Sequence, residues 1–173
     1  MNFSIPAVAC ASALLVVLPA AGQEHAAKAL MQSADGKDLG IVTFEQTKSG
    51  MLRIFVEMTG LPPGPHGFHI HEKGQCDAAG GFESAGGHLA GGKEHGFNAE
   101  KGPHIGDLPN VHVAADGILK VEFFTDRLTL DEGAENSLRK PDGAAVVVHA
   151  DADDYGAEES GHAGSRIACG VIE

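Results

Sequence analysis

The sequence is poor in basic residues: 12 lysines and arginines stand against 24 aspartates and glutamates, a formal net charge of −12. This acidity disfavours nucleic acid and stable association with anionic lipid, because both partners are themselves negatively charged. Sustained hydrophobic periodicity of 3.6 residues is also missing, which argues against a helical domain. Charge of either sign is absent from residues 1–22, which contain no Asp, Glu, Lys, Arg or His.

That uncharged segment ends in small residues, Leu18-Pro19-Ala20-Ala21-Gly22, before the first charge at Glu24. The pattern predicts a secretory signal peptide over residues 1–22. Its first residues lack Lys and Arg, so a retained membrane anchor is the competing interpretation. Cleavage would leave residues 23–173, enough for one domain with a hydrophobic core.

Cysteine is scarce, and one of the three, Cys10, lies in the predicted signal peptide. An exported chain would keep Cys76 and Cys169, for which one disulfide is the default expectation and two free thiols the alternative. In the chain-entropy model, closing a loop of that length stabilises the fold by about 4–5 kcal/mol.

Short β-like runs bounded by Gly, Pro, Asp and Asn fill the rest of the chain. They predict eight strands and an all-β, antiparallel Greek-key sandwich or barrel. The runs cover residues 26–32, 39–46, 51–58, 66–72, 111–115, 118–125, 144–150 and 165–172. A helical turn is expected within the less regular segment 128–140. Two long polar connections, residues 73–109 and 151–164, are predicted to be functional loops.

Histidines mark a metal centre. In a strand over residues 66–72, His69 and His71 point to one face while Phe68 and Ile70 point to the other. Further candidate ligands lie in the first long loop and at the end of the run Val146-Val147-Val148: His88, His95, His104, Asp107 and His149. Six histidines and one aspartate are one ligand short of two four-coordinate sites, and one imidazole shared between two metals would fill the gap.

These residues resemble the copper,zinc superoxide dismutases, especially the exported bacterial branch. The resemblance spans most of residues 23–173 and rests on five segments: GPHGFHIHEKGQC, GGFESAGGH, HIGDLP, VVVHADADDYG and AGSRIACGVI. It implies one copper and one zinc per subunit. Copper would be bound by His69, His71, His88 and His149, and zinc by His88, His95, His104 and Asp107, with His88 as the bridge.

The same resemblance implies roles for four more residues. Asp153 would hydrogen-bond a zinc-bound and a copper-bound histidine, His95 and His69. Arg166 would bind the anionic substrate beside the copper, and Cys76 would form a disulfide with Cys169. The implied reaction converts two superoxide anions into dioxygen and hydrogen peroxide by alternate reduction and oxidation of copper, with His88 delivering a proton.

The resemblance also implies an antioxidant enzyme of the periplasm, with secretion as the alternative and superoxide as its substrate. A homodimer is compatible with it, and the sequence leaves monomer and dimer open. Two other functions compete: a copper-carrying module without turnover, expected to lack Arg166 or a ligand, and a copper-only dismutase, expected to lack His95 or Asp107. Lys73, Lys93 and Lys101 could steer the anion in an acidic protein.

Overall fold

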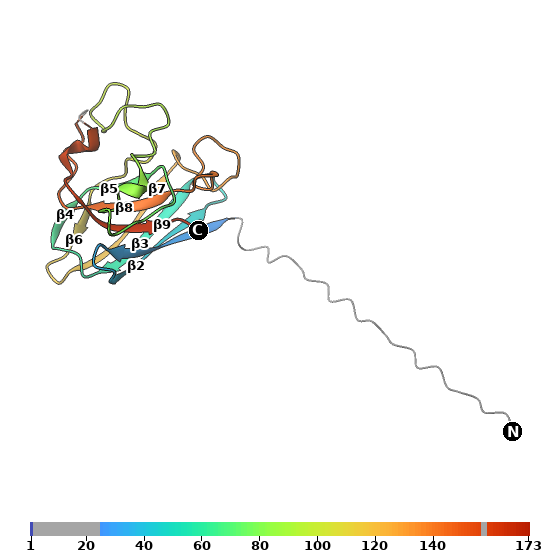
Figure 1. Cartoon of the computed structure of the whole chain (residues 1–173). Coiled ribbons are helices and arrows are strands. Elements are labelled where there is room, and N and C mark those ends of the chain that lie inside the picture. Colours follow the sequence, from blue (N-terminus) through green and yellow to red (C-terminus); the bar gives the residue numbers. More distant parts are fainter. Residues whose placement is uncertain (2–24, 157–158) are drawn as a thin grey trace.

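The computed structural model describes Met1 and residues 25–156 and 159–173. The predicted signal peptide therefore lies outside the described residues, apart from Met1. Figure 1 shows the described chain as a curled sheet with long loops gathered over one side. Among the described residues, no helix has the length and apolar character that crossing a membrane requires.

The described residues form nine strands and two short 3₁₀ helices. The strands are β1 (Ala26–Ser33), β2 (Asp38–Gln46), β3 (Leu52–Thr59), β4 (Gly64–His66), β5 (Phe68–His71), β6 (Val111–Val113), β7 (Ile118–Thr125), β8 (Ala145–His149) and β9 (Arg166–Val171). The helices are η1 (Glu83–Ala85), in the first long loop, and η2 (Glu159–His162), in the second.

All strand pairings are antiparallel. Seven strands form one sheet in the order β5-β8-β9-β1-β2-β3-β7, and β4 pairs with β6 in a second, two-stranded sheet. Some neighbouring strands are distant in sequence, such as β3 with β7 and β5 with β8. Long connections link them, as in Greek-key folds. The predicted all-β Greek-key class is confirmed.

One predicted strand divides in two, which accounts for nine strands in place of eight. At Gly67 the backbone leaves the β4–β6 pairing: its N–H donates to Asp151, and its carbonyl accepts from His149. The segment beyond Gly67 then pairs with β8 in the larger sheet. The predicted helical turn in 128–140 is wrong. That described segment forms turns and a parallel bridge between Thr129 and Ser137.

The main core fills the inside of the curled sheet. Strand β5 shows how alternate side chains are divided between this core and the outer face. Phe68 and Ile70 are fully buried in this core, and their neighbours His69 and His71 lie on the opposite face. A smaller apolar cluster lies beneath the first long loop and contains Phe82, Ala85, Ala145, Val147 and Cys169. The histidine face is therefore backed by the core and covered by a loop.

Register places the disulfide beside the histidines. His69 pairs with Val147, and Val147 pairs with Cys169, so the three residues form one row across β5, β8 and β9. Cys169 is bonded to Cys76 of the first long loop, which confirms the predicted disulfide. The bond ties the loop to the sheet next to the histidine row.

The first long loop also docks on the open edge of β5. Ile70 accepts a hydrogen bond from Leu89 N–H (2.8 Å) and donates one to Gly106 O (2.9 Å). A Cβ on Gly106 would lie 2.4 Å from the carbonyl oxygen of Ile70, so this approach requires glycine. Two turns of the loop are thus fixed to the strand that carries His69 and His71.

Candidate metal centre

The structure brings all seven predicted ligands together in two groups that share His88. The first, here the all-histidine group, contains His69, His71, His88 and His149. The second, here the mixed group, contains His88, His95, His104 and Asp107. Within each group the potential ligand atoms all lie within 4.8 Å of one another.

Strand pairing builds most of the all-histidine group. His69 and His71 project from β5, and His149 ends β8, the strand that pairs with β5. His88 reaches them from the loop through an antiparallel bridge to His71. The three strand histidines are nearly inaccessible to solvent, with at most 3% of their surface exposed.

Four buried nitrogens in this group have no hydrogen-bond partner: His69 Nδ1 and the Nε2 atoms of His71, His88 and His149. A buried polar atom without a partner is costly, so its presence in a folded protein calls for an explanation. Four imidazole nitrogens gathered within 4.8 Å of one another are a donor set that suits Cu(II). The residues fit that ion.

The opposite nitrogens of three of these rings are held. His71 Nδ1 donates to Gly86 O (2.9 Å), His149 Nδ1 donates to Gly164 O (3.2 Å), and His69 Nε2 contacts Asp153 Oδ2 (2.8 Å). Each contact places the proton on the nitrogen that faces away from the group. The unpartnered nitrogen therefore keeps its lone pair for a metal.

The mixed group surrounds a fully buried carboxylate. The Nδ1 atoms of His88, His95 and His104 lie 3.0–3.2 Å from the Asp107 carboxylate oxygens. The backbone N–H groups of Gly96 and His104 also donate to Asp107 Oδ2, which fixes its orientation. Three imidazoles and one carboxylate suit a closed tetrahedral zinc site, so these residues fit zinc.

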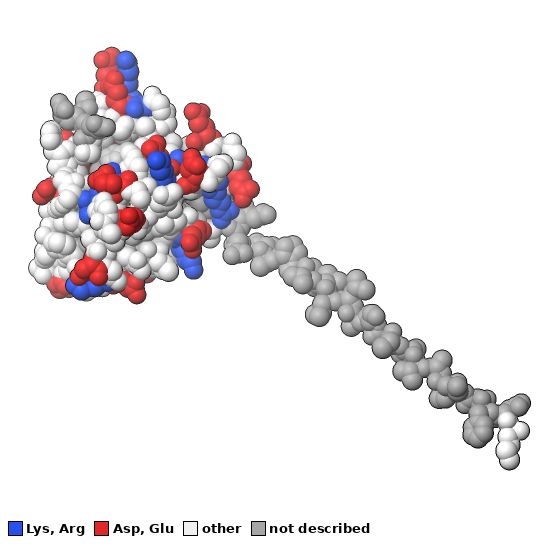
Figure 2. Space-filling view, in the orientation of Figure 1, with Lys and Arg blue, Asp and Glu red and all other residues white. Residues whose placement is uncertain are grey.

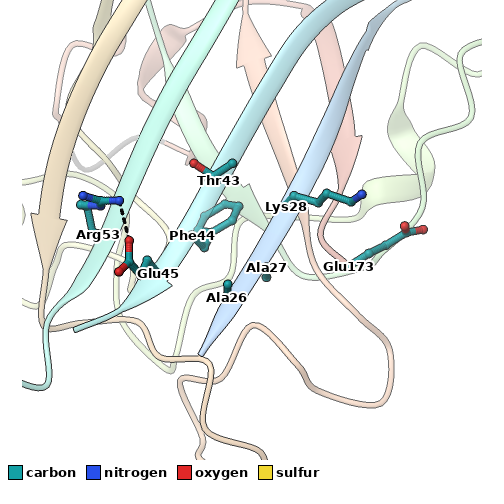
Figure 3. Close-up of a pocket in the computed structure, with 8 residues that line it drawn as sticks. All are labelled: Ala26, Ala27, Lys28, Thr43, Phe44, Glu45, Arg53 and Glu173. Carbon is teal, nitrogen blue, oxygen red and sulfur yellow. Dashed lines mark hydrogen bonds and ion pairs between the residues drawn. The ribbon is translucent and has the colours of Figure 1, made fainter. Parts of the chain in front are cut away.

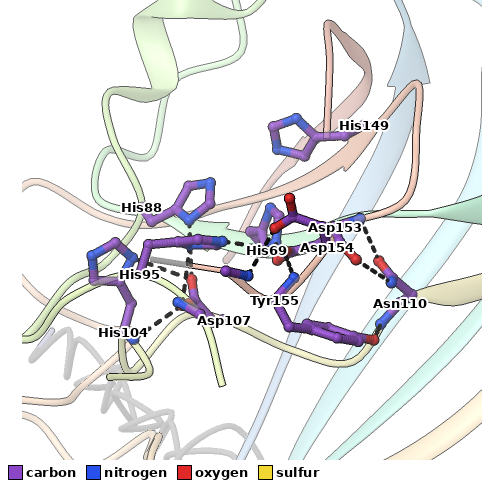
Figure 4. A network of polar contacts seen from close by, with 12 residues as sticks. His69, His88, His95, His104, Asp107, Asn110, His149, Asp153, Asp154 and Tyr155 are labelled. Carbon is purple, nitrogen blue, oxygen red and sulfur yellow. Dashed lines mark hydrogen bonds and ion pairs between the residues drawn. The ribbon is translucent and has the colours of Figure 1, made fainter. Parts of the chain in front are cut away.

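Asp153 links the two groups (Figure 4). Its carboxylate lies 2.8 Å from His69 Nε2 and 3.2 Å from His95 Nε2, and it also accepts a bond from Tyr155 N–H. The Asn110 side chain donates to the Asp153 carbonyl (2.8 Å) and accepts from its N–H (2.9 Å). The predicted neighbours of Asp153 are thus the ones observed, and Asn110 holds its backbone.

Burial and hydrogen bonds set the protonation of four of the candidate ligands. It lowers the pKa of His71 to about 2, of His149 to about 3 and of His88 to about 4. Burial alone would raise the pKa of Asp107, but hydrogen bonds from His104, His88 and the Gly96 N–H hold it well below its usual range. At neutral pH the imidazoles of His71, His88 and His149 are neutral and the Asp107 carboxylate is charged, the forms that bind metals.

Arg166 lies at the mouth of the all-histidine group. A cavity of about 330 Å³ is lined by Arg166, Glu83, His71, His88 and His149, among others. The guanidinium donates to the carbonyls of Phe82 (2.7 Å) and Gly86 (2.8 Å) and lies 3.4 Å from Glu83. Because Gly86 O also accepts from His71, one carbonyl joins Arg166 to the histidine group.

Comparison with known proteins agrees with this donor set. Residues 39–172 match the family described as copper/zinc superoxide dismutase. The chain belongs to the copper/zinc superoxide dismutase family. It is 40% identical over 164 residues to superoxide dismutase [Cu-Zn] 2 of Aquifex aeolicus, with 94% of this chain and 95% of that one covered.

Two further relatives are bacterial. The superoxide dismutase [Cu-Zn] of Caulobacter vibrioides is 41% identical, with 85% of each chain covered. The crystal structure of a SOD-like protein from Bacillus subtilis is 39% identical, has a TM-score of 0.79, and is covered over 96% of its length and 83% of this chain. The predicted family and enzyme class are confirmed: this is an oxidoreductase of the superoxide dismutase family, whose all-histidine group could bind copper and whose mixed group could bind zinc.

A cavity away from the metal centre has none of this chemistry. A cavity of about 480 Å³ between β1, β2 and β3 is lined by Ala26, Lys28, Thr43, Glu45 and Arg53, with neither imidazole nor thiol (Figure 3). Figure 2 shows acidic and basic side chains interspersed over one face of the molecule. Lys73, Lys93 and Lys101 are exposed and do not line the cavity at Arg166, so steering by them stays a prediction.

His66 ties the copper strand to its surroundings, as expected of a structural histidine. Its ring nitrogens lie 2.8 Å from the carbonyl oxygens of His149 and Pro62. Sequence reasoning missed four residues that support the centre. Arg127 bonds the backbone carbonyls of two ligands, Asn110 and Tyr155 bond Asp153, and Gly106 bonds the strand that carries His69 and His71. Their types are common in loops, and only the contacts mark them.

Proposed function

We propose that this dismutase uses the all-histidine group for copper and the mixed group for zinc, with His88 shared and Arg166 binding superoxide. The observation that carries the assignment is the position of His88. Its Nδ1 lies 3.0 Å from Asp107 in the mixed group, and its Nε2 is buried without a partner in the all-histidine group. One ring thus presents a nitrogen to each site.

When bound, copper supplies the one-electron couple that oxidises one superoxide to dioxygen and reduces another to hydrogen peroxide. The chain supplies orientation and one of the two protons that hydrogen peroxide requires, and solvent water supplies the other. His88 Nε2 can hold a proton, and its side chain is 5% exposed beside the cavity at Arg166. A proton held there would lie within reach of a bound anion.

Arg166 is the proposed anion-binding residue. Two carbonyls occupy one N–H group on each terminal nitrogen, and a guanidinium has five N–H groups in all. Its contacts to Phe82 and Gly86 fix the side chain before substrate arrives. In a protein of net charge −12, a fixed cation at the mouth supplies local attraction for an anion.

Asp153 is proposed to hold one ligand of each metal in the correct tautomer. Its two oxygens contact His69 and His95 separately, so each ring directs its other nitrogen toward its own group. Partners of this kind typically change metal affinity about 10–100-fold.

We infer that the chain acts outside the cytoplasm, in the periplasm, after removal of residues 1–22. The Cys76–Cys169 disulfide suits an oxidising compartment, and the uncharged segment 1–22 has the composition of a signal peptide. Mass spectrometry of the protein from a periplasmic fraction tests this: a mature amino terminus near residue 22 is expected, and an intact amino terminus would contradict it. A homodimer stays a prediction.

The function is tested by measuring metal content and superoxide dismutation on one purified sample. One copper and one zinc per chain with rapid dismutation are expected. Both metals without dismutation would contradict the proposal and favour a metal-carrying module.

Arg166→Ala tests the anion-binding role. Loss of the guanidinium should lower activity about 10-fold or more at unchanged copper and zinc content, because local positive charge speeds anion capture. Arg53→Ala is the matched control, since Arg53 pairs with Glu45 and Glu122 away from the centre. Activity near that of the unchanged chain in Arg166→Ala would refute the assignment.

A further inference from the structure

Arg127 lies directly behind the mixed group and contacts two of its members. Its Nη1 donates to the carbonyl of His104 (3.0 Å), and its Nη2 donates to the carbonyl of Asp107 (2.7 Å). The side chain is half-buried. A single guanidinium therefore spans the two ends of the turn that carries both ligands.

The turn from His104 to Asp107 is short and is closed by two hydrogen bonds. Asp107 N–H donates to the His104 carbonyl (3.2 Å), and His104 N–H donates to Asp107 Oδ2 (3.0 Å). Both carbonyls bonded by Arg127 thus belong to residues whose side chains meet in the group. A planar fork with parallel N–H groups sets the spacing of two acceptors more tightly than a point charge does.

Arg127 also acts near His95, the third ligand of this loop, by contacting an aromatic ring. The guanidinium carbon of Arg127 lies 5.0 Å from the centroid of Phe97, two residues beyond His95. The Phe97 ring in turn meets Tyr155 edge-on, with centroids 5.4 Å apart. Cation–π contact with the guanidinium holds Phe97, and with it the segment after His95.

Arg127 is itself anchored to the sheet. It follows β7, which pairs with β3 along its whole length. Its N–H donates to Thr125 Oγ1 (3.1 Å), and its carbonyl accepts from Asn136 Nδ2 (3.0 Å). Because its backbone is fixed at the end of β7, the Arg127 side chain can hold the first long loop, which has no strand of its own, in place against the sheet.

We propose that Arg127 is a positioning residue for zinc: it holds the His104–Asp107 turn and the segment after His95 in the geometry that binds the ion. The inference rests on the proposed zinc set. It adds a residue outside the ligand sphere that acts through two backbone carbonyls and one ring.

The test measures zinc affinity of the full chain by competition with a chromogenic chelator, together with the visible absorption of cobalt(II) placed in the mixed group. Arg127→Met removes the donors at similar length, and Arg127→Lys keeps the charge but cannot bridge two carbonyls. Arg53→Met serves as the control. Arg127→Met should weaken zinc binding about 10–100-fold, with a smaller loss for Arg127→Lys and a changed cobalt spectrum in both.

Zinc affinity of Arg127→Met within about twofold of the unchanged chain would overturn the inference, even if its metal-free form melted at a lower temperature. Should Arg127→Met fail to fold, Arg127→Lys decides: an unaltered cobalt spectrum and zinc affinity would overturn the inference. If the unchanged chain itself binds no zinc, the proposed zinc set fails and the inference fails with it. Normal zinc binding by the unchanged chain and by both variants refutes the role of Arg127 alone.

Discussion

The two halves of the metal centre are positioned by different means. His69, His71 and His149 belong to paired strands, so sheet register places them. His95, His104 and Asp107 belong to a loop, where side-chain hydrogen bonds, a disulfide and Arg127 replace the ladder. The group proposed for copper therefore shares the rigidity of the sheet, whereas in the group proposed for zinc each contact contributes separately.

Removing the disulfide should give the largest difference between the two metal groups. The double change Cys76→Ser with Cys169→Ser frees the first long loop and removes a cross-link that spans 93 residues of the unfolded chain. We expect a loss of about 3–5 kcal/mol in the free energy of unfolding, measured by denaturant titration. Zinc should dissociate faster, while copper held by β5 and β8 is affected less. Equal acceleration for both metals would show that the loop positions the two halves alike.

Gly161→Ala should disturb both halves together. A Cβ there would lie 1.9 Å from Asp153 Oδ1 and 2.6 Å from His95 Nε2, so the carboxylate that joins the two groups must move. We expect a loss of about 2 kcal/mol beyond the cost of the backbone, with weaker binding of both metals, measured by calorimetry and competition.

Gly36→Ala is the matched control for that change. Gly36 also has a positive φ, +77° against +55° for Gly161, and nothing lies within 4 Å of its Cβ position. It therefore reports the backbone cost alone, about 1 kcal/mol. If Gly161→Ala matched Gly36→Ala in stability and metal affinity, the packing of Gly161 against Asp153 would be without consequence.

Tyr155→Phe should have the smallest effect. It removes the hydroxyl that accepts a bond from Asn110 N–H (2.8 Å) but keeps the ring against Phe97. We expect a loss of about 1 kcal/mol with metal affinities unchanged, measured by thermal unfolding and metal competition. A large fall in affinity for either metal would mean that Asn110 depends on this hydroxyl to hold Asp153.

Local pattern predicted the parts of the fold that repeat. Alternation in residues 66–72 placed Phe68 and Ile70 in the core and His69 and His71 outside, because a strand can only alternate. The break at Gly67 was not predictable, since it depends on hydrogen bonds to Asp151 and His149. The irregular segment 128–140 was misassigned for the same reason, because bridging of Thr129 to Ser137 leaves no periodic signal.

The ligand types, the strand alternation and the pair of cysteines could be predicted without a structure, because they follow from residue chemistry and local geometry. Tertiary structure decided which nitrogen of each ring is free, since hydrogen bonds to Asp153, Gly86 and Gly164 occupy the others. It also decided how a loop without strands becomes a binding site. Gly106 meets Ile70, Asn110 meets Asp153 and Arg127 meets His104 across segments distant in the sequence, and only folding brings these pairs together.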